Sequence, residues 1–101
     1  MSFGTGQFSG TPTYMAPELF QKKAYDEKVD IFAFGTLVWE VMARKIPYDG
    51  YDVSEIKSKC LNDEKLNMPK SFSNEIIELI NSCRRLDPNK RPTFEEISGK
   101  I

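Results

Sequence analysis

The sequence contains no histidine and only two cysteines, Cys60 and Cys83, among its 101 residues. Without histidine, the chain cannot supply the imidazole that activates a serine or cysteine nucleophile. Two cysteines far apart in the sequence are too few for a four-ligand zinc site. We therefore expect no histidine-assisted nucleophile and no metal site in this chain.

An excess of one charge and a long apolar run are also missing. The 14 basic and 15 acidic residues give a formal net charge of -1, so no broad field attracts nucleic acid or an anionic membrane. No apolar stretch reaches the roughly 18 residues that cross a bilayer, and residues 1–10 lack the pattern of a signal peptide. A secreted domain of this size would carry more cysteines. We expect a cytoplasmic protein that binds neither nucleic acid nor membrane.

The pattern that is present predicts one all-α domain. No window shows the sustained alternation of a strand. The longest helix is expected from residue 30 to residue 44, because apolar residues surround its helical wheel, and such a helix must be buried. Shorter helices are predicted at residues 18–22, 52–62 and 73–84, and from Thr93 to about Gly99.

Capping signals predict where two of these helices start. Asp52 and Glu55 have the Asp-x-x-Glu spacing, and Thr93 and Glu96 have the Thr-x-x-Glu spacing. In such a capping box, each side chain accepts a hydrogen bond from the backbone of the other residue. Each box predicts that a helix begins directly after its first residue.

Three motifs follow one another along the chain: GTPTYMAPE at residues 10–18, DIFAFG at residues 30–35 and DPNKRPTF at residues 87–94. In this order they resemble the protein kinase family, whose signatures include an Ala-Pro-Glu element. The resemblance extends from about Gly4 to the C-terminus. It implies a partial kinase domain, a helical bundle that matches the lower part of the large lobe. Residues 1–18 would form a flexible activation segment and residues 19–101 the helical subdomain.

The resemblance implies roles for three charged residues. The family residues that match Glu18 and Arg91 form a buried ion pair, which ties the activation segment to the base of the lobe. The residue that matches Asp30 anchors the backbone of the catalytic loop through its carboxylate. Each also has a plainer interpretation, in which Glu18 and Asp30 favour helix N-termini and Arg91 is solvated.

A substrate-side loop is implied for residues 10–14. The threonine in this stretch is typical of serine/threonine kinases, in which it reaches the catalytic aspartate and a lysine. The loop would consist of Gly10, Thr11, Pro12, Thr13 and Tyr14.

Thr5 and Ser9 are candidate phosphosites, because they precede this loop within the implied activation segment. A phosphate adds a charge of about -1.5 to -2 and can order a loop against arginines. The alternative is that both are plain loop hydroxyls.

Residues that would transfer phosphate are not recognisable. Phosphoryl transfer needs a Gly-rich loop, a lysine paired with a helix glutamate, a catalytic aspartate and metal-binding Asn and Asp residues. The run SFG at residues 2–4 superficially resembles Asp-Phe-Gly, but serine cannot replace the metal-binding carboxylate. We therefore expect no catalytic residue, metal or cofactor in this chain, and ATP and magnesium only in a parent enzyme.

The run DIFAFG, with LVWE at residues 37–40, resembles most closely the tyrosine-kinase-like branch of serine/threonine kinases. Two positions depart from that branch. Arg84 stands where a tryptophan usually follows the helix cysteine, and Phe32 stands where a tryptophan or tyrosine is usual. The departures weaken the branch assignment and leave the fold inference intact.

Two functions are compatible with these features. In the first, the chain is the C-lobe portion of a serine/threonine kinase, and its partners are a protein substrate and the missing kinase segments. In the second, it is a non-catalytic kinase remnant that binds or assembles, because apolar residues such as Phe34, Leu37 and Trp39 would lack their usual cover and promote self-association. A helical DNA-binding domain is disfavoured, because no predicted helix carries a basic stripe.

Overall fold

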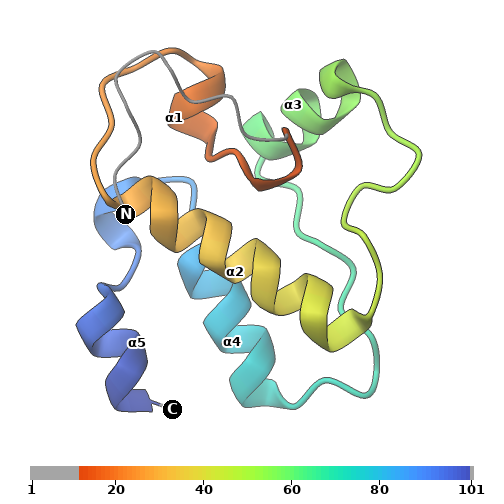
Figure 1. Cartoon of the computed structure of the whole chain (residues 1–101), viewed down its shortest axis with the longest axis vertical. Helices are drawn as coiled ribbons and strands as arrows, with labels where there is room; N and C mark the ends of the chain where they lie inside the picture. Colours follow the sequence, from red (N-terminus) through yellow and green to blue (C-terminus); the bar gives the residue numbers. More distant parts are fainter. Residues whose placement is uncertain (1–11, 101) are drawn as a thin grey trace.

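The computed structural model describes residues 12–100. Within this range the chain forms helices and no strand, which confirms the all-α prediction. Figure 1 shows the helices in their spatial order. The elements are η1 (Pro12–Tyr14), α1 (Pro17–Phe20), α2 (Lys28–Ala43), α3 (Val53–Leu61), α4 (Asn74–Cys83), η2 (Pro88–Lys90) and α5 (Phe94–Lys100).

Helix α2 is the centre of the fold, because its side chains enter all three apolar clusters. Val29 and Phe32 pack towards α1 and α3 with Ala16 and Cys60. Farther along the helix, Trp39 packs with Leu66, Phe72 and Ile80. The third cluster joins Ile31 of α2 to Cys83 and Ile97. Helix α4 therefore lies along α2, and Figure 1 shows α1 and α3 on the side of α2 away from α4.

The close packing of α2 on α4 depends on Gly35. A Cβ at this position would lie 2.6 Å from the Cβ of Cys83 and 3.3 Å from the carbonyl oxygen of Ile80. A carbon contact this short is repulsive. The two helices can therefore approach to this separation only with glycine at residue 35.

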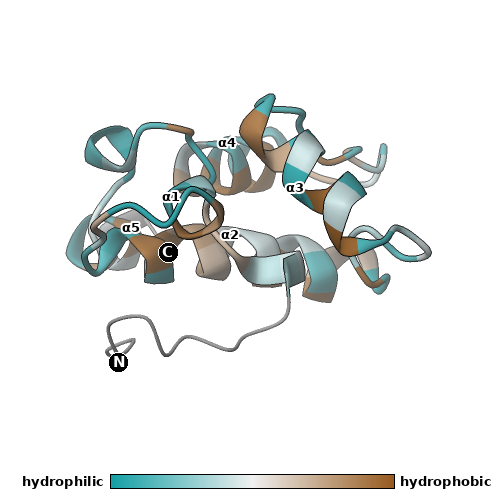
Figure 2. Cartoon of the chain, turned by 90° about the horizontal axis from the view of Figure 1, so that it is seen from above, coloured by the Kyte–Doolittle hydropathy of each residue, from teal (hydrophilic) through white to brown (hydrophobic). Residues whose placement is uncertain are grey.

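The prediction that α2 is buried all round is wrong for the part of the chain that the structure describes. In the view of Figure 2, α3 and α4 both lie above α2, while Figure 1 shows them on opposite sides of it. On another side Leu37, Val41 and Met42 are exposed, and Val41 keeps 64% of its surface accessible. We call these three residues the open face of α2. The sequence pattern identified the apolar residues correctly, but burial also needs a neighbouring element on each side.

Both predicted capping boxes are confirmed. The Asp52 carboxylate accepts the backbone N–H of Glu55 at 2.8 Å, and Glu55 accepts the N–H of Asp52 at 3.2 Å. Thr93 and Glu96 exchange the same two hydrogen bonds at 3.1 and 2.9 Å. Helices α3 and α5 therefore begin where the sequence indicates.

Helix α2 begins at Lys28, two residues before its predicted start. The reason is local, because the carboxylate of Asp26 accepts the backbone N–H of Lys28 at 2.9 Å. Asp30 consequently lies within the first turn of α2, so the interpretation of Asp30 as the helix cap is wrong. Its negative charge still lies near the positive end of the helix.

Candidate functional site

Glu18 and Arg91 form a buried, two-pronged ion pair. Pro17 occupies the first turn of α1 and fixes the backbone, so that Glu18 follows it at the positive end of this short helix. Nη1 and Nη2 of Arg91 donate to the two carboxylate oxygens of Glu18 at 2.8 and 2.9 Å. The Arg91 side chain is 0% exposed and that of Glu18 is 7% exposed. The structure thus brings together the two residues that the motifs single out.

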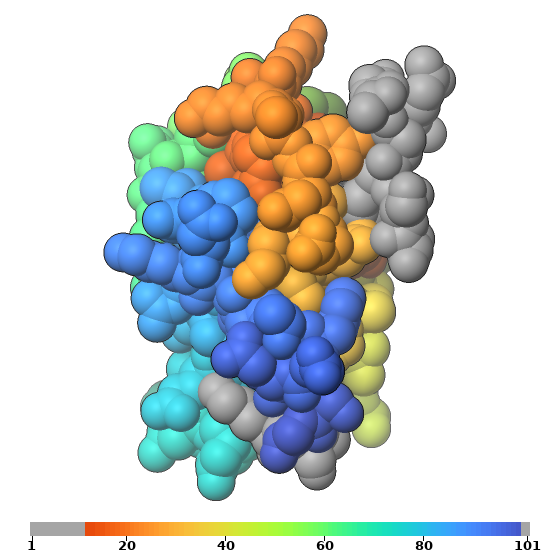
Figure 3. Space-filling view, turned by 90° about the vertical axis from the view of Figure 1, so that its left-hand side faces the viewer, coloured from red at the N-terminus to blue at the C-terminus, as the bar shows by residue number. Residues whose placement is uncertain are grey.

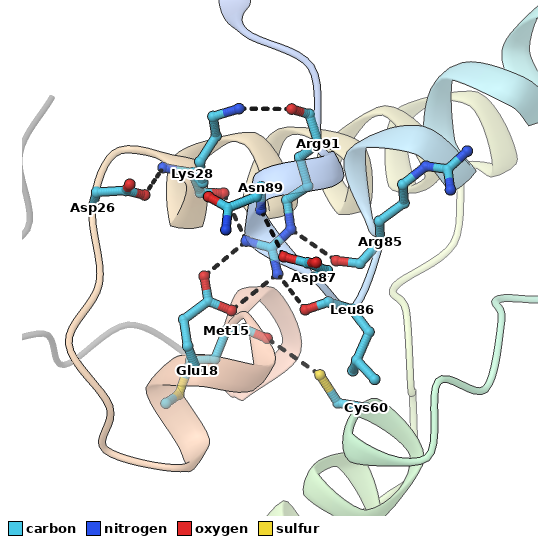
Figure 4. Close-up of polar contacts among 10 residues, drawn as sticks. All are labelled: Met15, Glu18, Asp26, Lys28, Cys60, Arg85, Leu86, Asp87, Asn89 and Arg91. Carbon is cyan, nitrogen blue, oxygen red and sulfur yellow. Dashed lines mark hydrogen bonds and ion pairs between the residues drawn. The ribbon is translucent and has the colours of Figure 1, made fainter.

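The guanidinium of Arg91 also binds three backbone carbonyls, as Figure 4 shows. Nε donates to Arg85 at 2.8 Å, Nη1 to Lys28 at 3.0 Å and Nη2 to Leu86 at 3.4 Å. With the two bonds to Glu18, all five N–H donors of Arg91 are used. This arrangement joins α1, the start of α2 and the segment before η2. We call Glu18, Arg91 and these three carbonyls the ion-pair corner.

The segment that carries Arg91 is itself fixed by local contacts. The Asp87 carboxylate accepts the backbone N–H of Asn89 at 2.9 Å and so caps η2. The ammonium of Lys28 donates to the carbonyl oxygen of Arg91 at 2.6 Å, which makes the contact between α2 and Arg91 reciprocal. Figure 3 shows the face of the molecule on which early residues of the described chain, in orange, lie beside late residues, in blue.

A second arginine, Arg84, links α4 to α2 and to the loop that follows α2. Its Nε donates to the Thr36 hydroxyl at 2.9 Å and its Nη2 to the Tyr48 hydroxyl at 2.8 Å. The Cζ of Arg84 lies 4.7 Å from the centre of the Phe32 ring, and the Cζ of Arg91 lies 5.0 Å from the same ring. The two departures from the pattern of the tyrosine-kinase-like branch, Arg84 and Phe32, are therefore in contact with each other.

Part of the predicted substrate-side loop lies within η1. Pro12, Thr13 and Tyr14 form this single turn, and the Tyr14 hydroxyl donates a hydrogen bond to the carboxylate of Glu40 on α2. This hydrogen bond, with partial burial and the negative charge of Glu40, raises the pKa of Tyr14 above 10.0. Gly10 and Thr11, the other two residues of the predicted loop, lie outside the described residues, as do the candidate phosphosites Thr5 and Ser9.

Sequence reasoning missed Glu40, although a signal was present. Glu40 is the only charged residue between Ile31 and Ala43, a stretch that is otherwise apolar or small. An isolated acid in such a helix needs a polar partner if it is partly buried. The partner proved to be Tyr14, which is 26 residues away in the sequence.

Cys60 on α3 contacts Met15, the residue that follows the predicted substrate-side loop. It is buried, and its Sγ lies 3.7 Å from the carbonyl oxygen of Met15, to which the thiol donates. Burial raises the pKa of Cys60 to about 11, although the nearby guanidinium groups of Arg84 and Arg91 oppose that shift. The thiol is therefore protonated and unreactive at neutral pH.

Asp30 lies in the first turn of α2 and is half-buried. Burial, followed by the negative charge of Glu27, raises the pKa of Asp30 above 3.8. Its carboxylate has no hydrogen bond or ion pair with any residue between 12 and 100. The structure thus leaves Asp30 separate from the ion-pair corner.

Two kinds of feature are not found among the described residues. No group of three or more His, Cys, Asp or Glu side chains among them could hold a metal ion. No helix in the same range is long and apolar enough to cross a membrane.

Comparison with known proteins identifies one protein family. The family model described as "Protein tyrosine and serine/threonine kinase" matches residues 5–101. A protein of Dictyostelium discoideum named as a probable LIM domain-containing serine/threonine-protein kinase is 41% identical over 91% of this chain and 14% of its own length. A candidate serine/threonine-protein kinase of Trypanosoma brucei brucei is 38% identical over 89% of this chain and 21% of its own length. The chain thus spans about a fifth or less of these relatives.

Proposed function

The chain belongs to the protein tyrosine and serine/threonine kinase family, and from this we propose that it forms the lower, helical part of the large lobe of a cytoplasmic serine/threonine kinase. The parent enzyme would transfer phosphate from ATP, with magnesium, to a hydroxyl of a protein substrate. The observation that carries this proposal is the buried pair of Glu18 and Arg91. It attaches the end of the implied activation segment to the base of the bundle.

Residues 10–14 would serve the parent enzyme as its substrate-side loop. Two contacts support this role, because each fixes the end of the loop to a different helix. Tyr14 binds Glu40 on α2, and the carbonyl of Met15 accepts the thiol of Cys60 on α3. Contacts that hold Tyr14 and Met15 in place reduce the conformational entropy that this end of the loop loses when a protein substrate binds.

The open face of α2 and the carboxylate of Asp30 would contact kinase segments that precede this one in the parent enzyme. Leu37, Val41 and Met42 are large apolar residues that remain exposed. An exposed apolar patch of this kind indicates a contact surface. We propose that the catalytic loop lies against the first turn of α2, where Asp30 would accept hydrogen bonds from its backbone. Such bonds would favour the ionised carboxylate, in opposition to the effect of burial.

Catalysis and nucleotide binding would reside outside the present 101 residues. The sequence has no Gly-rich phosphate loop and no Asp-Phe-Gly element, and the described residues offer no metal site. The chain alone would therefore contribute substrate positioning and structural support. Thr5 and Ser9 would be the positions at which phosphorylation regulates the parent enzyme.

The test begins with the native transcript. We would sequence it upstream of the Met1 codon, express the complete reading frame, and measure transfer of labelled phosphate from ATP to a generic protein substrate. We expect an in-frame Gly-rich loop, catalytic loop and Asp-Phe-Gly element, and phosphate transfer by the long protein but not by the 101-residue chain. Mass spectrometry of the long protein after incubation with ATP would show whether Thr5 or Ser9 is modified.

Two outcomes would contradict the proposal. Transfer of phosphate by the 101-residue chain would show that the missing motifs are not needed. An in-frame stop codon without those motifs upstream would show that the native product is not a phosphotransferase.

The second outcome would favour a non-catalytic binding or assembly module. The open face of α2 favours this alternative, because uncovered apolar surface promotes contact with a partner or a second copy. Sedimentation velocity over a range of protein concentrations would distinguish the two functions. A monomer at every concentration would count against assembly through this face.

A further inference from the structure

Residues 44–52 connect α2 to α3 at the edge of the molecule (Figure 1), and they contain the dipeptide Asp49-Gly50. No other aspartate or asparagine in the chain precedes a glycine. Neither residue belongs to the ion-pair corner or to the predicted substrate-side loop. The function proposed above therefore assigns no role to this dipeptide.

An aspartate that precedes a glycine can react with its own backbone. The nitrogen of the glycine attacks the carbon of the side-chain carboxyl group and closes a five-membered succinimide ring. Glycine favours this step, because it has no Cβ to obstruct the approach and its φ and ψ are less restricted than those of other residues. The reaction is fastest where no other contact holds the carboxyl group or the N–H of the glycine.

Both reacting groups of Asp49-Gly50 are free of other contacts. The two residues are exposed, and the Asp49 carboxylate makes no hydrogen bond or ion pair with any residue between 12 and 100. The N–H of Gly50 donates no hydrogen bond within the same range. Gly50 has φ of 87°, in the region that favours glycine, and a Cβ built there would meet nothing within 4 Å. No side-chain or backbone partner among the described residues therefore competes for either reacting group.

The other aspartates of the chain differ from Asp49. None precedes a glycine, and Asp87 precedes a proline, which has no N–H to react. Asp30 is half-buried within α2. The four exposed ones have partners for their carboxylates, because Asp26, Asp52 and Asp87 accept backbone N–H groups at 2.9, 2.8 and 2.9 Å and Asp63 lies 3.9 Å from Lys65 Nζ. These aspartates are therefore internal controls for Asp49.

We propose that Asp49-Gly50 is a site of spontaneous isoaspartate formation in the folded chain. The Gly50 nitrogen bonds to Cγ of Asp49 and loses its proton, a C–O bond of the carboxyl group breaks, and one water molecule leaves. Water then opens the succinimide ring. Addition of water at Cγ restores aspartate, whereas addition at the main-chain carbonyl carbon gives isoaspartate, with Cβ in the main chain and a free α-carboxylate. Water is the only co-reactant, and no group is oxidised or reduced.

Isoaspartate changes the turn in which it forms. The N–H of Tyr51 donates to the carbonyl oxygen of Tyr48 at 3.0 Å, across the dipeptide. The reaction adds one carbon to the main chain inside this turn and so breaks the hydrogen bond. The turn lies between Tyr48, which binds Arg84, and Asp52, which caps α3. The new α-carboxylate is also the group that an S-adenosylmethionine-dependent isoaspartyl methyltransferase esterifies, so the dipeptide is a potential substrate site for that class of enzyme.

The test follows isoaspartate in the 101-residue chain during incubation at 37 °C in neutral buffer. Far-UV circular dichroism would first check that the chain is folded. Samples taken over several weeks would be digested and analysed by electron-transfer mass spectrometry, which distinguishes isoaspartate from aspartate. An isoaspartyl methyltransferase with labelled S-adenosylmethionine would measure the total. We expect isoaspartate at residue 49 to form at least about tenfold faster than at Asp52 or Asp63.

Two variants and one control test the mechanism. Asp49→Asn closes the same ring with loss of ammonia, which leaves more readily, and should form isoaspartate at least about tenfold faster. Asp49→Glu keeps the charge but should form no detectable isomer, because its ring would need six members. Glu78→Gln alters an exposed carboxylate of α4 and should leave the rate at residue 49 unchanged.

The proposal is overturned if isoaspartate at residue 49 forms no faster than at Asp52 or Asp63, or if Asp49→Asn stays intact under the same conditions. A blocked peptide of residues 46–54, incubated in parallel, gives the rate without the fold. A folded chain that reacts more than about a hundredfold slower than this peptide would also overturn the proposal, because the fold would then protect the site. The assay measures no phosphate transfer, so its failure would leave the proposed kinase function untouched.

Discussion

The two ends of α2 are stabilised by different forces. At its N-terminal end, the buried charges of Glu18 and Arg91 satisfy each other and the surrounding carbonyls. Towards its C-terminal end, Trp39 packs in an apolar cluster on one side of the helix, while Val41 on another side keeps 64% of its surface exposed. The first end is therefore held by buried polar contacts, whereas the second is held by apolar packing on one side only. Substitutions at the two ends should therefore have very different effects.

The largest effect is expected for Arg91→Ala. This change leaves the Glu18 carboxylate buried without its partner, which costs about 3–5 kcal/mol of unfolding free energy. Urea unfolding measured by circular dichroism would determine this value. Lys45→Ala removes an exposed charge beyond the other end of α2 and should change the free energy by less than about 0.5 kcal/mol. If both variants lost the same unfolding free energy, the two ends of α2 would not differ in their contribution to stability.

A double substitution sharpens the same comparison. Glu18→Leu combined with Arg91→Met removes both charges and leaves apolar groups in the corner. Replacement of a buried pair by apolar residues is often nearly neutral, although here the carbonyls of Lys28, Arg85 and Leu86 lose a donor. We expect the double variant to be more stable than Arg91→Ala. If it is less stable, the unpaired carboxylate is not the main cost of the single change.

The next effect lies in the middle of α2, at Gly35. Gly35→Ala places a methyl group 2.6 Å from the Cβ of Cys83 and should destabilise the chain by about 1–3 kcal/mol. Gly99→Ala is the matched control, because nothing lies within 4 Å of its added Cβ and alanine favours a helix by up to about 1 kcal/mol. Thermal unfolding would compare the two. A stabilising Gly35→Ala would show that α2 and α4 can separate without loss.

A smaller effect is expected for Tyr14→Phe, about 1 kcal/mol, through loss of the hydrogen bond to Glu40. The pKa of Tyr14 is raised in the folded chain. Its contribution is therefore present in full below pH 10 and is lost as the pH rises, because the unfolded chain gives up the phenolic proton first. Urea unfolding between pH 8 and pH 11 should show a steeper decline for the unmodified chain than for Tyr14→Phe. Parallel declines would contradict this interpretation.

The smallest effect is expected for Val41→Gln on the open face of α2. Because Val41 is mostly exposed, the free energy of unfolding should change by less than about 0.5 kcal/mol. If the 101-residue chain self-associates through this face, the same variant should sediment more slowly at high concentration. A loss of stability above about 1 kcal/mol would show that the open face is covered within the chain itself.

Local signals predicted the starts of α3 and α5, because a capping box involves residues only three positions apart. They did not predict the start of α2, since its N-cap residue is Glu27, which makes no side-chain cap hydrogen bond, and Asp26 instead accepts the N–H of Lys28. The motifs drew attention to Glu18 and Arg91, which the structure places together. They could not indicate the three carbonyls around Arg91, because those depend on how α1, α2 and η2 are arranged in space.

Sequence patterns could not predict the contacts of Tyr14 and Arg84 either, because these contacts join residues far apart in the sequence. Tyr14 meets Glu40, and Arg84 meets Tyr48, across separations of 26 and 36 residues. Nothing in the periodicity of α2 indicates which loop will cover a given side chain. The exposure of the open face was equally unpredictable, because an apolar pattern shows which residues favour burial and not whether another element is present to bury them.

The rate at which a thiol reagent labels the buried Cys60 would report how often the substrate-side loop separates from α3. Its pKa of about 11 and its contact with the carbonyl of Met15 protect it from thiol reagents while α3 and the loop stay together. Chemical labelling at Cys60 would therefore require a transient separation of these two segments. The labelling half-life would then time how often the loop detaches in the native protein, without any added probe or substrate.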